Sequence, residues 1–115
     1  MPLKLVIWVG SSLEDLRSFP DVARQRAGHN LHLVQLGLEP GDWKPMTDVG
    51  PGVTELRIRT DRAHRVFYVA RFPEAIYVLH AFEKKTRKTA RQDLEIGRAR
   101  LRAVLRMRQE RRRKD

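Results

Sequence analysis

The chain of 115 residues contains no cysteine, which excludes disulfide bonds, thiol catalysis and cysteine-based metal sites. The absence of cysteine fits a reducing compartment, so we expect the protein in the cytoplasm. A long hydrophobic run is also missing. The apolar stretch over residues 5–9 is far too short to span a bilayer, and no signal-peptide cleavage pattern accompanies it. We therefore expect neither export nor a membrane partner.

Acidic residues are scarce in the C-terminal part of the chain. Residues 1–83 contain ten Lys or Arg and ten Asp or Glu, whereas residues 84–115 contain fourteen and four, which accounts for the whole net charge of +10. Such a basic pole attracts a polyanion, because Lys and Arg that neutralise phosphates release condensed counterions. Nucleic acid is therefore the expected partner. The alternative is a solvated basic helix that only keeps the protein soluble.

The size and the 41% hydrophobic content predict a single domain over residues 1–115. Period-two alternation over residues 3–8 predicts a short strand that stops at Gly10. Ser12, with an acidic residue three positions later, predicts a helix N-cap, and Pro20 ends this short helix just before it. The chain is therefore expected to begin with a strand followed by a helix.

A second helix is predicted from Pro20 to about Gly37, because apolar residues recur at intervals of three or four. These residues are Val22, Ala23, Ala27, Leu31, Val34 and Leu38. The two helices are expected to form a hairpin. Residues 39–52 then turn to Pro, Gly, Asp and Trp, a composition that predicts a mobile surface loop.

Three β-type runs follow, over residues 53–59, 65–71 and 75–82, and the short joints between them predict an antiparallel meander. From residue 90 the apolar positions recur at helical spacing, so we expect a C-terminal helix with exposed arginine flanks. Its tail, residues 106–115, is nearly free of apolar side chains and is expected to project or fray. The predicted fold class is α+β, with an N-terminal strand and helical hairpin packed on a small antiparallel sheet, followed by a helix.

Basic residues gather around the predicted meander, namely Arg57, Arg59, Arg65, Lys84 and Lys85. Strand alternation places Arg57 and Arg59 with Val53 and Glu55 on one face, opposite Leu56 and Ile58. A ribonuclease that uses no metal or other cofactor needs such a cluster, because guanidinium and ammonium groups stabilise the charge on the phosphorane oxygens. We predict that Arg57 and Arg65 bind the phosphate. The structural alternative for Arg57 is an ion pair with Glu55 or Glu83 across the sheet.

Three stretches of the sequence resemble a known family: ELR at 55–57, RVFY at 65–68 and LHAFEKKTRKT at 79–89. They are similar to the signature of phage-derived HigB-like toxins in the RelE/ParE superfamily. The resemblance covers the chain almost end to end and is weakest in the tail beyond Arg106. It implies a RelE-like fold and a toxin that cleaves messenger RNA at the ribosomal A site. It also implies a partner, a helix-turn-helix antitoxin.

Carried over by position, the resemblance places the family's phosphate-binding basic residues on Arg57 and Arg65, and the basic pair after the last strand on Lys84 and Lys85. Phe82 falls where an aromatic ring supports or stacks on a base. It shares its predicted face with Ile76 and Val78, however, so core packing is at least as good an explanation. The full set of expected RNA-binding residues is Arg59, Phe82, Lys85, Arg87 and Lys88.

The proton-transfer group departs from the family pattern, because no Tyr or His follows His80. His80 is the best-placed general acid or base, with Tyr68 in reserve, and a buried, hydrogen-bonded structural histidine is the alternative. Lys84, with a pKa lowered by surrounding cations, is a further candidate. His29 and His32 lack a third ligand, so no metal site is expected.

Two other functions suit the same fold, which does not determine function by itself. One is a ParE-like toxin that inhibits gyrase by binding alone. The other is a nucleic-acid-binding module without catalysis, which the missing proton carrier favours. For the ribosome-dependent toxin, the basic C-terminal helix is expected to dock on ribosomal RNA or to be masked by the antitoxin.

Overall fold

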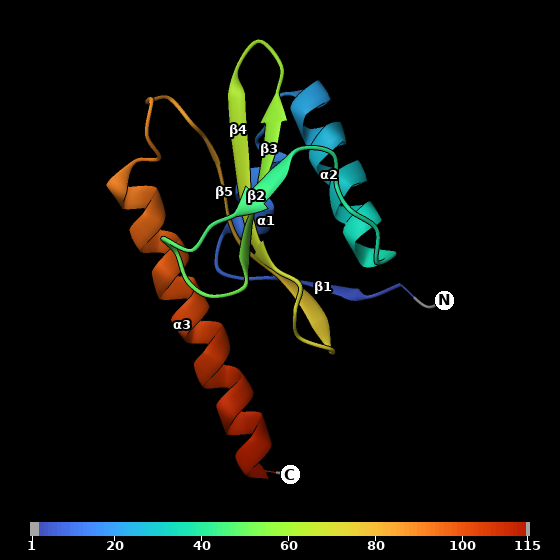
Figure 1. The fold of residues 1–115 in the computed structure, drawn as a ribbon, viewed down its shortest axis with the longest axis vertical. Helices are drawn as coiled ribbons and strands as arrows, with labels where there is room; N and C mark the ends of the chain where they lie inside the picture. Colours follow the sequence, from blue (N-terminus) through green and yellow to red (C-terminus); the bar gives the residue numbers. More distant parts are fainter. Residues whose placement is uncertain (1–2, 115) are drawn as a thin grey trace.

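The computed structural model describes residues 3–114; Met1, Pro2 and Asp115 of the predicted domain and tail lie outside the described part. In chain order its elements are β1 (Leu5–Trp8), α1 (Ser12–Arg17), α2 (Asp21–Gln35), β2 (Trp43–Pro45), β3 (Val53–Arg59), β4 (Ala63–Val69), β5 (Ala75–Glu83) and α3 (Arg91–Lys114) (Figure 1). This arrangement confirms the predicted α+β, RelE-like fold class. None of the described helices is long and apolar enough to cross a membrane.

The strands form one sheet in the order β1-β5-β4-β3-β2. The strands β3, β4 and β5 are the predicted antiparallel meander. The N-terminal strand β1 runs parallel to β5, with Leu5 opposite Ala75 and Trp8 opposite Val78, so it extends the antiparallel meander into a mixed sheet, a pairing that the sequence did not predict. A parallel pair needs a long connection between its strands, and here the helical hairpin and two strands of the meander supply it.

The composition of residues 39–52 had predicted a loop, but the segment also contains a strand. Within it β2 pairs antiparallel with β3 and sets Lys44 opposite Glu55. Met46 and Val49, which follow β2, are buried against the core on the α3 side. Backbone pairing and these apolar contacts hold the segment against the sheet, where it forms a wall of the cavity described below.

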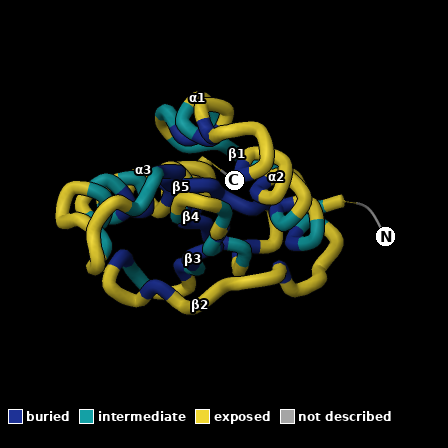
Figure 2. The backbone as a smooth tube through the Cα atoms, turned by 90° about the horizontal axis from the view of Figure 1, so that it is seen from above, coloured by how far each residue is buried: buried dark blue, intermediate teal, exposed yellow. Residues whose placement is uncertain are grey.

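Helices cover both faces of the sheet, and the buried backbone in Figure 2 lies at the sheet between exposed outer segments. On one face α1 and α2 pack against residues that include Leu56, Ile58 and Val66. On the other face α3 contributes Leu101 and Val104 to a core with Phe67, Tyr77 and Leu79. The alternation of β3 therefore places Leu56 and Ile58 on the side of the helical hairpin and leaves the opposite face to α3.

Four of the six residues predicted for the buried face of α2 are buried: Ala23, Ala27, Leu31 and Val34. Val22 and Leu38 are exposed, at 52% and 56%, and their placement in the core was wrong. Val22 lies in the first turn beside the buried stripe, and Leu38 follows the end of the helix. Periodicity alone did not separate residues beside or beyond the helix face from those on it.

The N-cap of the first helix, α1, is Ser11, one residue before the predicted cap Ser12. Ser11 Oγ donates a hydrogen bond to Asp15 Oδ2 at 2.7 Å. Ser12 is buried, and its Oγ donates to the Val78 carbonyl at 3.0 Å. Its hydroxyl therefore attaches α1 to β5 instead of capping the helix.

Arg100 belongs to an arginine flank of α3 that was predicted to be exposed, but it is half-buried and connects α3 with β5 and with Ser11. Its Nη1 donates to the Leu79 carbonyl of β5 and its Nη2 to Ser11 Oγ, both at 2.9 Å. Gly10 has a φ of +58°, and a Cβ at this position would lie 2.6 Å from Arg100 Nε. Glycine is required there because only its backbone both adopts this conformation and leaves space for the guanidinium.

A β-bulge in β5 changes which of its residues face α3. Phe67 of β4 lies opposite His80, whereas the next residue, Tyr68, lies opposite Val78, so Leu79 is the extra residue. Strict alternation predicted that Phe82 shares a face with Val78. The bulge reverses the order, and Phe82 belongs to the core on the α3 side. The predicted face of Phe82 was therefore wrong.

The C-terminal helix continues without a break through the basic tail to Lys114. Arg108 fastens the tail to the sheet: its Nε donates to Glu74 Oε2 at 2.6 Å and its Nη2 to Oε1 at 3.2 Å. These bonds, helped by the Tyr77 hydroxyl, lower the pKa of Glu74 to about 2. Arg108 also stacks over the Phe72 ring at 3.8 Å. The predicted mobility therefore concerns at most the turns after Arg108, and it stays a prediction.

Candidate nucleic-acid site

A cavity of about 360 Å³ opens on the α3 side of the sheet, between β2, β3, β4 and the segment that leads from β5 to α3. Its lining includes six basic side chains and two acidic ones: Lys44, Arg57, Arg65, Lys84, Arg87 and Lys88, with Asp48 and Glu55. A concave surface with such an excess of positive charge raises the local concentration of anions. We name it the cation cavity.

Strand register brings the two arginines of the cation cavity together. Arg57 on β3 lies directly opposite Arg65 on β4, so their side chains leave the same face of the sheet. Glu55 lies two residues before Arg57 and therefore shares that face, and β2 places Lys44 opposite it. Two like charges directly opposite each other destabilise a sheet unless a counterion compensates them.

The counterion is the buried carboxylate of Glu55. Its Oε1 accepts a hydrogen bond from Arg57 Nε at 3.1 Å and lies 3.7 Å from Arg65 Nε and 3.9 Å from Lys44 Nζ. The ion pair considered as the structural alternative for Arg57 is therefore present with Glu55, whereas Glu83 pairs with an arginine of the neighbouring turn. One carboxylate compensates three cations, which leaves the cluster positive.

Arg65 is the most buried cation of the cavity, with 5% of its surface exposed. Its Nη1 donates to the His64 carbonyl at 3.1 Å, while its buried Nε has no hydrogen-bond acceptor within residues 3–114. Burial lowers the pKa of Arg65, and Glu55 opposes this effect. Since a guanidinium carries five N–H donors, Arg65 keeps donors that the protein does not satisfy.

Lys84 lies at the end of β5 and shapes the wall that follows it. Its Nζ donates to the carbonyls of Thr86 and Arg87, at 2.8 and 2.6 Å, which folds the segment before α3 back over the cavity. Burial and then the neighbouring Arg65 guanidinium lower the pKa of Lys84. A lysine in this environment loses its proton more readily than a free one.

His80 does not line the cation cavity. It is buried, its Nε2 lies 2.8 Å from Asp93 Oδ1 of α3, and its ring stacks on Phe82 with centroids 4.8 Å apart. Burial lowers the pKa of His80, and the hydrogen bond with Asp93 partly offsets this. These contacts are those of the buried, hydrogen-bonded histidine that was the alternative to a catalytic one.

Only some of the predicted RNA-binding residues line the cation cavity. Arg87 and Lys88 line the cation cavity, while Arg59 and Lys85 are exposed outside its lining. Phe82 is 8% exposed, and its ring makes a T-shaped contact with Phe67 with the centroids 5.1 Å apart. The ring is therefore part of the core and is not available for stacking on a base. Tyr68, the reserve proton carrier, is buried on the opposite face, where burial raises its pKa to about 12.

Sequence reasoning missed Lys44 and Asp48, which reach the cavity from the segment predicted as a loop. The strand β2 has three residues, all exposed, which is too short a run for apolar–polar alternation to identify it from the sequence. Only the pairing of β2 with β3 places Lys44 beside Glu55.

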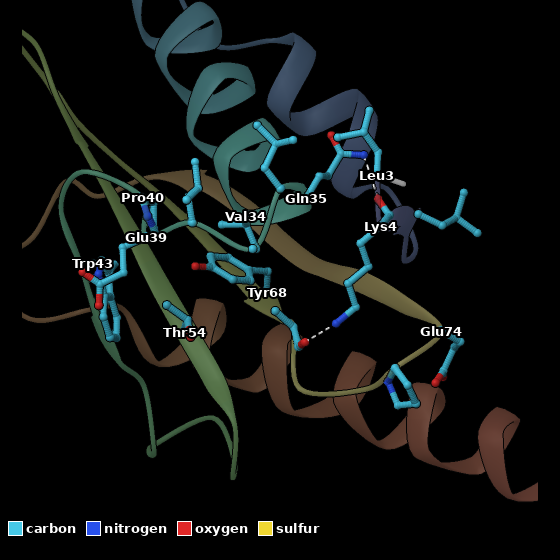
Figure 3. A pocket seen from close by; sticks show the side chains of 16 residues that line it. Leu3, Lys4, Val34, Gln35, Glu39, Pro40, Trp43, Thr54, Tyr68 and Glu74 are labelled. Atoms are coloured by element: carbon cyan, nitrogen blue, oxygen red, sulfur yellow. Dashed lines mark hydrogen bonds between the residues drawn. The ribbon is translucent and has the colours of Figure 1, made fainter. Parts of the chain in front are cut away.

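A larger hollow of about 750 Å³ lies elsewhere, between the end of α2, β1 and the strands β2, β3 and β4 (Figure 3). Its lining is largely apolar, and Lys4 is the one Lys or Arg among the described residues that form it. The Lys4 ammonium donates to the Ala70 carbonyl, and Gln35 Nε2 donates to the Lys4 carbonyl at 2.9 Å. This hollow lacks converging cations and is a poor site for a phosphate.

Residues 14–102 match the model of a family described as phage derived protein Gp49-like (DUF891). The matched range contains every residue that lines the cation cavity. No curated protein matches the chain.

Proposed function

The chain belongs to the phage-derived Gp49-like protein family, and on this premise we propose that it is the toxin of a toxin–antitoxin pair. Its activity is that of a ribosome-dependent endoribonuclease of the RelE/HigB type, which cuts messenger RNA in the cytoplasm and so inhibits translation. A helix-turn-helix antitoxin restrains it. The observation that carries the proposal is the convergence of Arg57, Arg65 and Lys84 on one cavity of about 360 Å³.

The cation cavity suits the cleavage of a phosphodiester by its own 2′-hydroxyl. The 2′-oxygen attacks phosphorus, the bond to the 5′-oxygen of the next nucleotide breaks, and the products are a 2′,3′-cyclic phosphate and a 5′-hydroxyl. Negative charge accumulates on the non-bridging oxygens during the attack. Arg57 and Arg65 donate hydrogen bonds to these oxygens, and because both are held by Glu55 little reorganisation is needed.

The reaction also needs a base that takes the proton of the 2′-hydroxyl and an acid that protonates the 5′-oxygen. Lys84 is the candidate base, because it lines the cavity and its pKa is lowered by burial and by Arg65. His80 is bonded to Asp93 outside the cavity, so the case for Lys84 is stronger than the case for His80.

The test of the proposed function is to incubate the purified protein with translating ribosomes and to map the 5′ ends of the messenger RNA. We expect codon-phased cuts that carry a 5′-hydroxyl. Intact messenger RNA together with inhibited gyrase would show a ParE-like toxin instead. RNA binding without cuts would show a non-catalytic module, and either result overturns the proposal.

The role of Lys84 predicts a pH dependence of the cleavage rate. The neutral amine is the active form, so the rate should rise with pH and level off below the ordinary lysine pKa of 10.5, because the pKa of Lys84 is lowered. Lys84→Arg keeps the charge but does not lose its proton. It should cut about 100-fold more slowly, with a flat profile between about pH 6 and 9. Single-turnover rates on programmed ribosomes measure both effects, and an unchanged slope in the variant contradicts the role.

A further inference from the structure

Four arginines lie in a row along one side of α3: Arg98, Arg102, Arg106 and Arg113. Successive members are four, four and seven residues apart. Because an α-helix turns about 100° per residue, these spacings keep all four within an arc of about 80°. We name this set the arginine row. It spans about 22 Å along the helix at a rise of about 1.5 Å per residue.

The arginine row lies beside the face of α3 that packs on the sheet. Gly97, Leu101 and Val104 form the buried face. Arg102, Arg106 and Arg113 are exposed, and the described part of the chain offers their side chains no hydrogen bond or ion pair. In contrast, the nearby Arg100 and Arg108 are committed to β5 and Glu74. The row therefore holds guanidinium groups that the fold itself does not use.

The arginine row begins at the rim of the cation cavity. Arg98 Nε donates to the Asp48 carbonyl at 2.7 Å, and Asp48 is part of the cavity lining. From there α3 carries the row away from the cavity toward the end of the helix (Figure 1). An anion that extends out of the cavity along α3 meets Arg102, Arg106 and Arg113 in turn.

We infer that the arginine row is a second RNA-binding surface, which holds the phosphate backbone of RNA that continues beyond the cation cavity. The inference rests on the proposed function and adds a track to its site. Arginines four residues apart lie about 6 Å apart along the helix, a spacing close to that of successive phosphates in an extended strand.

Two triple variants of the full chain test the row with equal loss of charge on the same helix. The first is Arg102→Gln, Arg106→Gln, Arg113→Gln; the matched control is Arg111→Gln, Arg112→Gln, Lys114→Gln, whose residues lie off the row. The probe is a single-stranded RNA with 2′-O-methyl riboses, which binds but cannot be cut by its own 2′-oxygen. Fluorescence anisotropy at several salt concentrations gives the affinity and its salt dependence.

We expect the row variant to lose at least about tenfold in affinity at low salt, and its slope of log K against log salt to decrease by about 2, since each phosphate contact on a single strand contributes about 0.7. The control should lose clearly less of both. Equal losses would show that only the total charge of the helix matters. Unchanged RNA affinity with weakened binding to polyglutamate would show a surface for an acidic protein. Both results overturn the inference.

The assay separates the row from the proposed function, because the methylated RNA reports binding whether or not the protein cleaves. Failure of the proposed function appears as intact ribosome-bound messenger RNA with wild-type protein. Failure of the row appears as equal affinities of the two triple variants for the methylated RNA. Thermal melts of both variants establish that their folds are equal, as expected for exposed positions.

Discussion

The double variant Arg57→Ala, Arg65→Ala is expected to cut ribosome-bound messenger RNA at least about 10³-fold more slowly than the wild type. The two guanidinium groups lie opposite each other on β3 and β4 and face one cavity. Loss of both removes the donors that stabilise the charge on the phosphorane oxygens. Single-turnover cleavage on programmed ribosomes measures the rate, and a variant that keeps the full rate contradicts the assignment.

The single variants distinguish loss of chemistry from loss of folding. Arg57 is 32% exposed in its side chain, so Arg57→Ala should keep the wild-type stability within about 1 kcal/mol and still lose about 100-fold in rate. Arg65→Lys keeps a positive charge but loses the two parallel donors of the guanidinium, so it should also cut more slowly than the wild type. Arg24→Ala, at an exposed position on α2, is the matched control and should cut normally.

Glu55→Leu is expected to lower the free energy of unfolding by about 3 kcal/mol, because removal of one partner of a buried ion pair leaves the other charge uncompensated. Glu55 is 1% exposed and is the carboxylate that Arg57, Arg65 and Lys44 share. The remaining charge that costs most is Arg65, since it is almost as buried as Glu55. Urea unfolding at neutral pH measures the difference.

The double variant Glu55→Leu, Arg65→Met tests the cause of that loss. Replacement of both members of a buried pair by apolar residues is often close to neutral, so the double variant should recover most of the stability that Glu55→Leu loses. It should not recover cleavage, because Arg65 is absent. The control Asp48→Asn removes an exposed carboxylate of the same cavity and should change stability by less than about 0.5 kcal/mol. A double variant no more stable than the single one would refute a role for the unpaired charge.

The surroundings of His80 could not be predicted from the alternation of residues in the last strand. From sequence, His80 alternates with apolar neighbours in the last strand, which left a catalytic role and a structural role open. The structure moves His80 to the α3 side through the bulge at Leu79 and gives it Asp93 as a partner. Asp93 lies thirteen residues later on a different element, so strand periodicity carried no information about it.

The elements with local signals could be predicted from the amino-acid sequence. Period-two alternation predicted β3 with its bounds and the shared face of Glu55 and Arg57. Three- or four-residue spacing predicted α2 and the buried part of α3, although Ala90 and Leu105, which the same spacing placed in the packed stripe, are exposed. These features depend on the side-chain period of a single strand or helix, which a stretch of sequence contains in full. The charge of the C-terminal helix was determined in the same way.

The pairings between distant segments became known from the folded chain and not from its sequence. The fold brought β1 parallel to β5, added β2 with Lys44 beside Glu55, and reversed the faces of β5 through one extra residue at Leu79. Each of these depends on backbone hydrogen bonds whose partners lie far apart in the chain or in a different register, and no local period specifies them. The arginines of the cation cavity could be found from the sequence of single strands, whereas the shape of the cavity depends on these long-range pairings.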